Sequence, residues 1–411
     1  MLKEITVEEK SFADYLPVIG QELFSEITEL AGRLKGKRVL HINATSDGGG
    51  VAELLRGEVP LMQALGIDAH WQVMQPKPGF FEITKHIHNA LQGESTGLNA
   101  DAWELYNEVS AELAKHIKPK DWDIILIHDP QPAGALGQTG KSDDTTWLWR
   151  CHIDSSTPDE AVAEHFVTYL QPFDGAIYTM PQFALPFFQP PHLAFTAVTI
   201  DPLSEKNLPM EKEEAQKLVS KFGVKPARPL ITQVSRFDRW KDPLGVIDAW
   251  RIAKRDIKDL QLALVGNTPN DDPQSATILE QVRHEVGNSK DVHLVVGAAT
   301  DREVKAFQTA SDVVIQKSIR EGFGLTVTEA LWAGTPVIGT RVGGIVLQIQ
   351  PGKNGYLVAT VQEAADAIKH IVTEPALAKR MGQHGHNHVS RHFLLPHMLR
   401  DDLKFFLEVS D

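Results

Sequence analysis

The sequence predicts an α/β protein built from two doubly wound domains, and three observations lead to this expectation. The chain has 411 residues, which is long for a single hydrophobic core. Short apolar runs alternate with amphipathic stretches in both halves, the pattern of a parallel sheet covered by helices. Between the halves, six prolines fall within residues 181–209, where neither a long helix nor a central strand can form.

We expect the first domain to span residues 1–205. A β-rich run at residues 37–43 leads through a glycine loop into a helix that begins at residue 51, which is the start of a βαβ unit. An amphipathic helix precedes this unit, near residues 21–34. Further strands are expected at residues 70–74, 123–128, 145–152 and 175–180, and further helices at 102–116 and 159–170.

We expect the second domain to span residues 206–393 and to repeat the alternation of strand and helix. A last amphipathic helix, at about residues 394–411, can pack back on the first domain. The predicted strands are 230–235, 261–265, 292–296, 312–316 and 336–339, and the helices include 243–255, 276–286, 302–309 and 361–373.

The composition excludes several classes of function. A net charge of −13 argues against a partner that is nucleic acid or a membrane surface, because both need basic patches. The single cysteine, Cys151, excludes an intrachain disulfide and fits a reducing cytosol. The chain lacks a signal-peptide core at its start and any apolar run near the roughly 18–20 residues that a spanning helix needs. We therefore expect a soluble cytoplasmic protein.

Residues 320–330 are the most informative stretch. An apolar run leads into a glycine-rich turn and then into a short helical segment. This order aims several N–H groups and the positive end of a helix at one point, which suits an anion. Glu321 and Glu329 flank the turn, and carboxylates suit hydroxyl groups carried by the same ligand. A phosphate flanked by hydroxyls describes a sugar nucleotide.

Two plainer interpretations of these glutamates stay open. Thr326 and Glu329 have the spacing of a capping box, in which the glutamate only holds a helix start together. Glu321 can equally be a surface residue.

Arg236 and Lys241 lie in a loop between a predicted strand and a predicted helix. Loop cations at the carboxyl end of a strand can bind phosphate, arginine through a planar fork and lysine as a compact charge. The alternative is a solvated, charged loop. The predicted anion site on the same sheet edge favours the binding interpretation.

The first domain offers two weaker signals. Gly48, Gly49 and Gly50 follow its first strand, where glycine lets the backbone approach a ligand, although such triplets often only turn the chain. His152 ends a predicted strand and is a candidate polar ligand residue, although a core histidine is the commoner case. Asp154 is either a ligand residue or the cap of the next turn.

No metal is expected in this protein. Neither an Asp-x-Asp pattern nor a cluster of histidine and carboxylate stands out at a predicted strand end. The phosphate charge would be met by Arg236, Lys241 and the amides at a helix end.

These residues together resemble the retaining glycosyltransferases of the GT-B architecture (glycosyltransferase family 4 type), which include sucrose and trehalose synthases. Glu321 and Glu329 match the family's pair of glutamates separated by seven residues, and Arg236 with Lys241 match its phosphate-binding pair. The resemblance extends to the glycosyltransferring trehalose synthases over about residues 37–395. It is carried by residues 41–53, 81–93, 149–154 and 200–207. One departure is Val346, where the family usually has proline, and we do not expect it to abolish activity.

The resemblance implies a role for each candidate in the second domain. Arg236 and Lys241 would bind the donor diphosphate and stabilise it as it leaves. The backbone amides of Gly324, Leu325 and Thr326 would assist them.

Glu321 would hydrogen-bond the hydroxyls of the donor glucose, and Glu329 those of the ribose. In the first domain, Gly49 and Gly50 would let the backbone approach the phosphates. His152 would contact the transferred sugar.

Asp154 and Asn43 would help place the acceptor. The two domains would face a central cleft. The implied activity is retaining transfer of glucose from a nucleoside diphosphate glucose, such as UDP-glucose or ADP-glucose, to free glucose, giving α,α-trehalose in a reversible reaction. The partners are small-molecule substrates with no cofactor, and a homodimer is possible. The alternatives are a retaining trehalose phosphorylase and a sugar-nucleotide epimerase or binding protein on the same fold.

Overall fold

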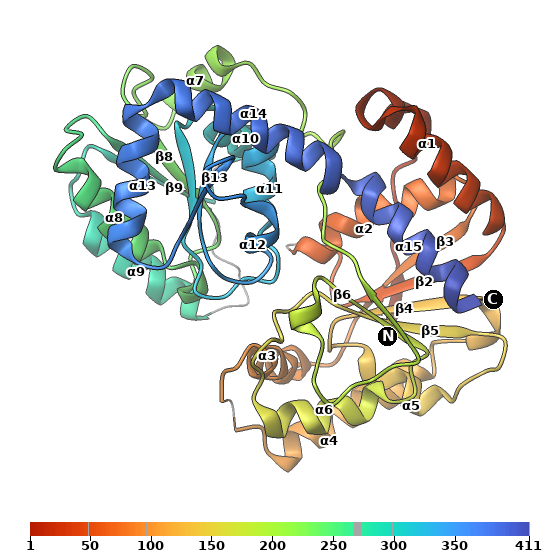
Figure 1. Cartoon of the computed structure of the whole chain (residues 1–411). Helices are drawn as coiled ribbons and strands as arrows, with labels where there is room; N and C mark the ends of the chain where they lie inside the picture. The colour runs from red at the N-terminus through yellow and green to blue at the C-terminus, as the bar shows by residue number, and fades with distance from the viewer. Residues whose placement is uncertain (48, 96, 267–272, 298, 411) are drawn as a thin grey trace. The chain divides into compact units, whose positions relative to one another are not determined.

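The computed structural model divides into two compact units (Figure 1). Unit 1 comprises Met1–Thr199 together with Leu395–Asp411, and unit 2 comprises Ile200–Leu394. The observed division therefore lies a few residues before the expected boundary at 205/206, and the last helix belongs to unit 1. The structure describes residues 1–47, 49–95, 97–266, 273–297 and 299–410.

Unit 1 contains a seven-stranded sheet whose strands lie in the order β1-β3-β2-β4-β5-β6-β7. All neighbouring strands are parallel except β1, which pairs antiparallel with β3. The strands are β1 (Leu2–Glu4), β2 (Arg38–Asn43), β3 (Asp68–Met74), β4 (Ile124–His128), β5 (Thr146–Cys151), β6 (Gly175–Tyr178) and β7 (His192–Phe195).

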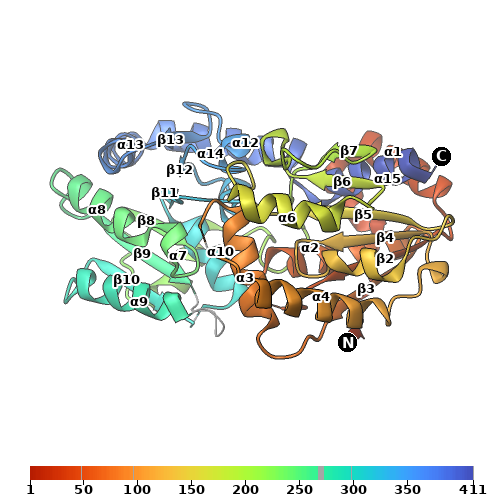
Figure 2. The ribbon, with the colours of Figure 1, turned by 90° about the horizontal axis from the view of Figure 1, so that it is seen from below.

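Helices cover both faces of this sheet. On one face α1 and α2 pack against α15, and on the other α3 packs against α4 and α6, which Figure 2 shows lying across the sheet. The helices are α1 (Leu16–Arg33), α2 (Gly50–Ala64), α3 (Phe80–Leu91), α4 (Ala100–Ala114), α5 (Leu136–Thr139), α6 (Glu160–Leu170) and α15 (Leu395–Ser410), with 3-10 turns η1 (Phe12–Tyr15), η2 (Pro119–Asp121), η3 (Ala133–Ala135) and η4 (Pro181–Phe183).

Unit 2 contains a six-stranded, all-parallel sheet in the order β10-β9-β8-β11-β12-β13. Counted from the first strand of the unit, this order is 3-2-1-4-5-6, that of the dinucleotide-binding Rossmann fold. The strands are β8 (Leu230–Val234), β9 (Gln261–Gly266), β10 (Val292–Val296), β11 (Val313–Gln316), β12 (Val337–Thr340) and β13 (Gly355–Val358).

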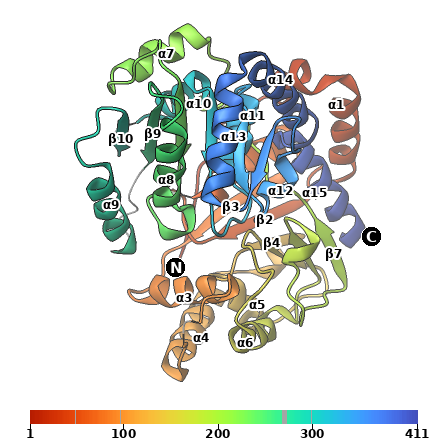
Figure 3. The ribbon, with the colours of Figure 1, turned by 60° about the vertical axis from the view of Figure 1, so that its left-hand side comes forward.

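Separate cores lie on the two faces of this sheet. Helices α8, α9 and α13 share one core, and α7 and α10 share the other. Figure 3 shows α8 and α13 side by side across their face. The helices are α7 (Lys212–Ser220), α8 (Pro243–Lys254), α9 (Pro273–Val286), α10 (Asp301–Ala310), α11 (Leu325–Trp332), α12 (Ile345–Gln348), α13 (Val361–Thr373) and α14 (Pro375–His392), with the 3-10 turn η5 (Arg239–Lys241).

Each sheet has a point where the order of its strands reverses. In unit 2 this switch point lies between β8 and β11, and in unit 1 it lies between β2 and β4. Loops that follow two such strands diverge to opposite faces and leave a crevice at their carboxyl ends, where open α/β sheets bind ligands. The predicted α/β class with two parallel sheets is thus confirmed. In each unit, a ligand site is expected at the switch point of the sheet.

The chain passes between the units twice, and the two passages are adjacent. Ile200 N–H donates to the carbonyl of Phe393 at 3.0 Å, and Ile200 forms a parallel bridge with Leu394. Unit 1 is therefore completed only by the helix that follows unit 2 in the sequence. Within the described ranges, no helix is both long enough and apolar enough to cross a membrane.

Candidate active site

The switch point of unit 2 carries the glycine-rich turn and helix α11. Helix α11 begins at Leu325, and its N-cap residue Gly324 has a φ of 86°, which glycine adopts without the steric cost that other residues meet. No side chain caps the helix start. The first-turn amides therefore retain the arrangement that suits an anion, as the sequence predicts for Gly324, Leu325 and Thr326. Their contact with a donor phosphate stays a prediction.

Lys241 and Glu321 meet at the same switch point, although 80 residues separate them. Lys241 follows β8 and Glu321 follows β11, and the ammonium lies 2.6 Å from a carboxylate oxygen of Glu321. Ser318 donates a second hydrogen bond to that oxygen at 3.0 Å. Glu321 is only 8% exposed, so it is not the surface residue of the plainer interpretation. A cation and a carboxylate held together here can meet a phosphate and a hydroxyl of one ligand.

Arg236 lies on the same loop but is held less firmly. Its side chain is about half exposed, and its guanidinium lies 3.2 Å from Asp238. Asp238 also caps the turn η5 by accepting from Lys241 N–H. Arg236 can therefore turn toward an incoming phosphate at little cost, whereas Lys241 is already placed.

Glu329 is not a helix cap. The capping-box interpretation is wrong, because it needs Thr326 as the N-cap residue, and the N-cap of α11 lies two residues earlier, at Gly324. Glu329 is instead fully buried, and its carboxylate lies 2.5 Å from Lys206 and 2.9 Å from the donating amide of Gln308. Its predicted role toward ribose stays a prediction.

A second glycine turn supports the first, and the sequence alone does not predict it. Gly344 N–H donates to the carbonyl of Gly322 at 3.1 Å, and the Gln348 amide donates to the carbonyl of Phe323 at 2.6 Å. Gly343 has a φ of 47°, and a Cβ atom there would lie 1.6 Å from the carbonyl oxygen of Glu321. The sequence signal that could have found this turn is the glycine pair Gly343-Gly344, which lies just before Ile345 and the Val346 departure.

Gly343→Ala is expected to lower transfer at least about tenfold, because the added methyl must displace the backbone of Glu321. Gly352→Ala is the matched control. Gly352 also has a positive φ, 76°, but a Cβ there would meet nothing within 4 Å. The control should lose about 1–2 kcal/mol of stability and keep its transfer rate. Steady-state kinetics and thermal unfolding of both variants measure this, and equal kinetics in the two would contradict it.

The switch point of unit 1 carries His152 within a row of three histidines. The Nε2 atom of His152 lies 3.0 Å from Nδ1 of His128, and Nε2 of His128 lies 3.2 Å from Nδ1 of His41. His41 and His128 are fully buried, whereas His152 is partly exposed. The commoner interpretation, a core histidine, thus describes the first two. His152 is partly exposed, and its contact with the transferred sugar stays a prediction.

Asn43 and Asp154 are already engaged within the protein. Asn43 accepts from Trp71 Nε1 at 2.7 Å and donates to the Thr45 carbonyl at 2.8 Å. Asp154 accepts from the hydroxyl of Ser156 at 2.6 Å and is 2% exposed. Both side chains shape the loops after β2 and β5. Their role in placing an acceptor stays a prediction.

The glycine loop of unit 1 leads directly into helix α2. Gly49 is the N-cap residue, with an extended backbone, and Gly50 is the first residue of the helix. A Cβ atom at Gly49 would meet nothing within 4 Å, so packing within the protein does not require glycine there. Close approach of a ligand to the backbone would be one reason for a glycine at position 49. Gly48 lies outside the described residues.

Acid should weaken unit 1, and His41 is one identifiable cause. Burial, aided by the charge of Arg150, lowers the pKa of His41 from 6.5 to about 3. Between these values the unfolded chain binds a proton at His41 that the folded chain does not bind. The contribution of His41 to the free energy of unfolding is therefore fully present above pH 6.5 and falls by about 1.4 kcal/mol per pH unit below it.

His41→Gln should remove this part of the acid dependence. Urea unfolding at pH 7 and pH 5.5, followed by fluorescence of the buried Trp71, Trp147 and Trp149 of unit 1, measures the change. His116→Gln, at an exposed position of the same unit, should keep the wild-type slope. A wild-type slope in His41→Gln would contradict the assignment.

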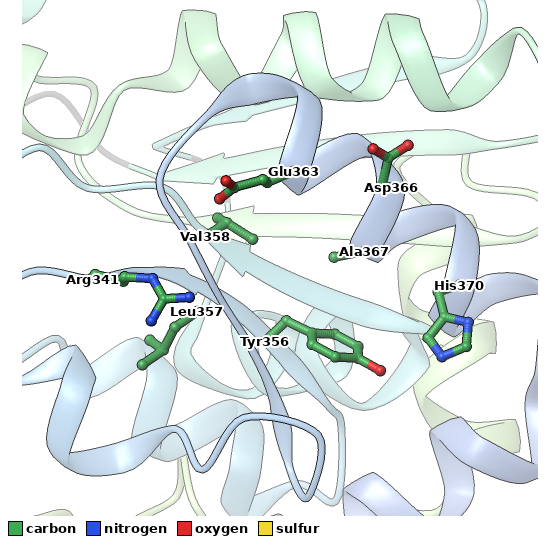
Figure 4. Close-up of a pocket in the computed structure, with 8 residues that line it drawn as sticks. All are labelled: Arg341, Tyr356, Leu357, Val358, Glu363, Asp366, Ala367 and His370. Carbon is green, nitrogen blue, oxygen red and sulfur yellow. The ribbon is translucent and has the colours of Figure 1, made fainter.

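A surface pocket in unit 2 contains none of the predicted site residues. It lies between β12, β13 and α13, and its lining includes Arg341, Tyr356 and His370 (Figure 4). Its two carboxylates serve α13 itself, because Glu363 accepts from Ala359 N–H and Asp366 pairs with Lys369. The pocket is therefore a less suitable anion site than the α11 turn. Among the described residues, no group of three or more histidine, cysteine or acidic side chains could hold a metal ion.

Comparison with known proteins first defines the class. Residues 214–388 match the family model of glycosyl transferases group 1, and residues 41–185 match that of the trehalose synthase N-terminal domain. Sucrose-phosphate synthase from Thermosynechococcus elongatus has a similar structure, with a TM-score of 0.68 and 20% identity over 90% of this chain and 98% of its own. The fold is that of the GT-B glycosyltransferases, and the protein is a glycosyltransferase.

The relatives narrow the class further. Trehalose synthase of Rubrobacter xylanophilus is 44% identical over 100% of this chain and 99% of its own length. Trehalose synthase of Pyrococcus horikoshii is 42% identical over 97% of both. The chain belongs to the trehalose synthase family. Trehalose phosphorylase of Pleurotus pulmonarius is more distant, at 29% identity over 92% of this chain and 58% of its own length.

Proposed function

We propose that this protein is a retaining glucosyltransferase that makes α,α-trehalose from a nucleoside diphosphate glucose and free glucose. The observation that carries the proposal is the meeting of Lys241, Glu321 and the start of α11 at the switch point of unit 2. This arrangement offers positive charge to a diphosphate and a carboxylate to the adjoining sugar. Membership of the trehalose synthase family supports trehalose as the product.

In the proposed reaction the C1 hydroxyl oxygen of the acceptor bonds to C1 of the donor glucose. The bond from that carbon to the diphosphate breaks, and the acceptor proton passes to the departing phosphate oxygen. The sugar keeps its anomeric configuration without a covalent link to the protein. Lys241, Arg236 and the amides at Gly324 and Leu325 would stabilise the leaving charge, since fixed donors aimed at developing charge lower the barrier. Glu321 would hold the sugar hydroxyls.

A direct test runs the reaction backward from trehalose. The purified protein is incubated with trehalose and with UDP, ADP or orthophosphate in separate reactions, and the products are separated by chromatography. Release of glucose together with a nucleoside diphosphate glucose supports the proposal and identifies the preferred nucleotide. Glucose 1-phosphate formed with orthophosphate alone would establish the phosphorylase instead. In the forward direction, nuclear magnetic resonance of the product should show two equivalent α-anomeric protons.

We also propose that the reaction needs no metal or cofactor and takes place in the cytoplasm. The cations at the donor site, Lys241 and Arg236, support the first point because they can meet the diphosphate charge. Cys151 is the single cysteine and is buried, so the chain forms no intrachain disulfide, which fits a reducing compartment. Transfer rates unchanged by a chelator would support metal independence. A homodimer stays a prediction.

A further inference from the structure

Three histidines form a diagonal row across unit 1, and the sheet register explains it. His41 lies opposite Leu126, and His128 lies opposite Arg150. Alternate residues of a strand share a face, so His41, His128 and His152 emerge on the same face, each displaced toward the carboxyl end. The rings stack with centroid separations of 5.4 Å and interplanar angles of 23° and 11°.

Burial favours the neutral form of all three imidazoles. Burial lowers the pKa of His41 to about 3, and burial with neighbouring positive charge lowers the pKa of His128 and of His152 well below 6.5. A neutral imidazole has one N–H and one bare nitrogen. Each N···N contact in the row must therefore pair an N–H with a bare nitrogen, and only two arrangements of protons satisfy both contacts.

The outer nitrogen of His41 distinguishes the two arrangements. Its Nε2 atom is buried and has no hydrogen-bond partner within the described part of the chain. In one arrangement every proton lies on Nε2, and His41 then buries an N–H with nothing to accept it. In the other every proton lies on Nδ1, and only a lone pair is left unpaired. Orphaned buried N–H groups are the rarer case, which favours the second arrangement.

We propose that His41 and His128 hold His152 as its Nδ1–H tautomer, so that His152 presents a hydrogen-bond donor, and not a base, to an oxygen of the transferred sugar. His41 and His128 are then positioning residues that act through His152. The identity of the sugar oxygen rests on the proposed function, whereas the tautomer does not. The Nδ1–H group of His152 is available before substrate binds, because neither N···N contact of the row has to rearrange.

The first test measures the tautomer. Protein labelled with ¹⁵N-histidine gives two-bond ¹H–¹⁵N correlations that distinguish the Nδ1–H, Nε2–H and doubly protonated rings, and the His152 signals are assigned from their loss in His152→Phe. The expected pattern for His152 at pH 7 is Nδ1–H. An Nε2–H or doubly protonated pattern overturns the proposal, whatever the activity of the enzyme.

The second test uses two variants at His128 that differ in the contact they keep. The amide of His128→Asn lies where Nδ1 was and can donate to His152. The longer amide of His128→Gln lies where Nε2 was, so it keeps the contact with His41 and leaves His152 unpaired. We expect His128→Gln to lower kcat roughly 10- to 100-fold and His128→Asn to stay within about threefold of wild type.

The activities and the His152 ¹⁵N patterns of the two variants decide whether His128 positions His152. Equal losses in the two variants, with His152 unchanged in its ¹⁵N pattern, overturn the positioning role. A selective loss in His128→Gln that accompanies a change of the His152 pattern supports it. If the wild-type protein shows the Nδ1–H pattern and yet transfers no glucose, the proposed function fails and the tautomer assignment stands.

Discussion

Lys241→Ala is expected to lower kcat/KM for glucosyl transfer by about 10²–10³-fold, because one fixed charge aimed at a leaving group stabilises a transition state by about 2.7–4 kcal/mol. Lys241 is 17% exposed, and its ammonium lies 2.6 Å from Glu321, which fixes a positive charge at the switch point. The loss should appear mainly in kcat, since charge on the departing phosphate develops in the transition state. Steady-state kinetics with varied donor concentration measures the effect.

Two controls make this result specific. Lys241→Arg keeps the charge near Glu321 and should recover part of the lost rate, although its planar fork differs in geometry from an ammonium group. Lys258→Ala removes an exposed lysine from the same unit and should leave the rate unchanged. A kcat/KM for Lys241→Ala within threefold of wild type would show that Lys241 does not stabilise the leaving group.

Asp402→Asn is expected to destabilise unit 1 by about 3–5 kcal/mol, the usual consequence of leaving one charge of a buried pair without its partner. Asp402 on α15 is fully buried and lies 2.6 Å from the guanidinium of Arg150, whose side chain is 2% exposed. For a unit of this size the loss corresponds to a fall in Tm of roughly 10 °C, measurable by circular dichroism or calorimetry.

Glu58→Gln provides the contrast to this variant. Burial and the neighbouring Asp402 carboxylate raise the pKa of Glu58 well above its ordinary value, which favours the neutral carboxyl in the folded protein. Glutamine replaces a neutral carboxyl of the same shape, and the expected loss is below about 1 kcal/mol. Equal losses in Glu58→Gln and Asp402→Asn would mean that the charge of the cluster has been assigned to the wrong carboxyl.

Strands and helices with a strong pattern could be predicted closely from the sequence. The strand β10 and the helix α13 have the predicted bounds, because a continuous apolar run and a clear helical period define them. The strand β1 was missed because three residues carry no period, and β7 was missed because it lies in the proline-rich stretch. As an edge strand, β7 tolerates that setting. Helix α14 contains two glycines and many polar residues, which weakened its signal.

The residues of the candidate site could be predicted from the sequence, but the contacts between them could not. Lys241 and Glu321 were both recognised, yet only the parallel pairing of β8 with β11 brings them together. The sequence alone does not single out His41, because a histidine within an apolar strand resembles any other core residue, and only the register places it beside His128. Lys206 and Gln308, which bind Glu329, come from segments far away in the sequence.

The late arrival of α15 has a consequence for biosynthesis. Unit 2 is one uninterrupted segment, whereas the sheet of unit 1 leaves the ribosome roughly 200 residues before the helix that completes it. At ordinary rates of translation this interval lasts about 10–40 s. Throughout that time Arg150 lacks the carboxylate of Asp402, and the face that α15 will cover is open to water and to chaperones. Unit 2 can thus finish folding before unit 1, although most of unit 1 is synthesised first.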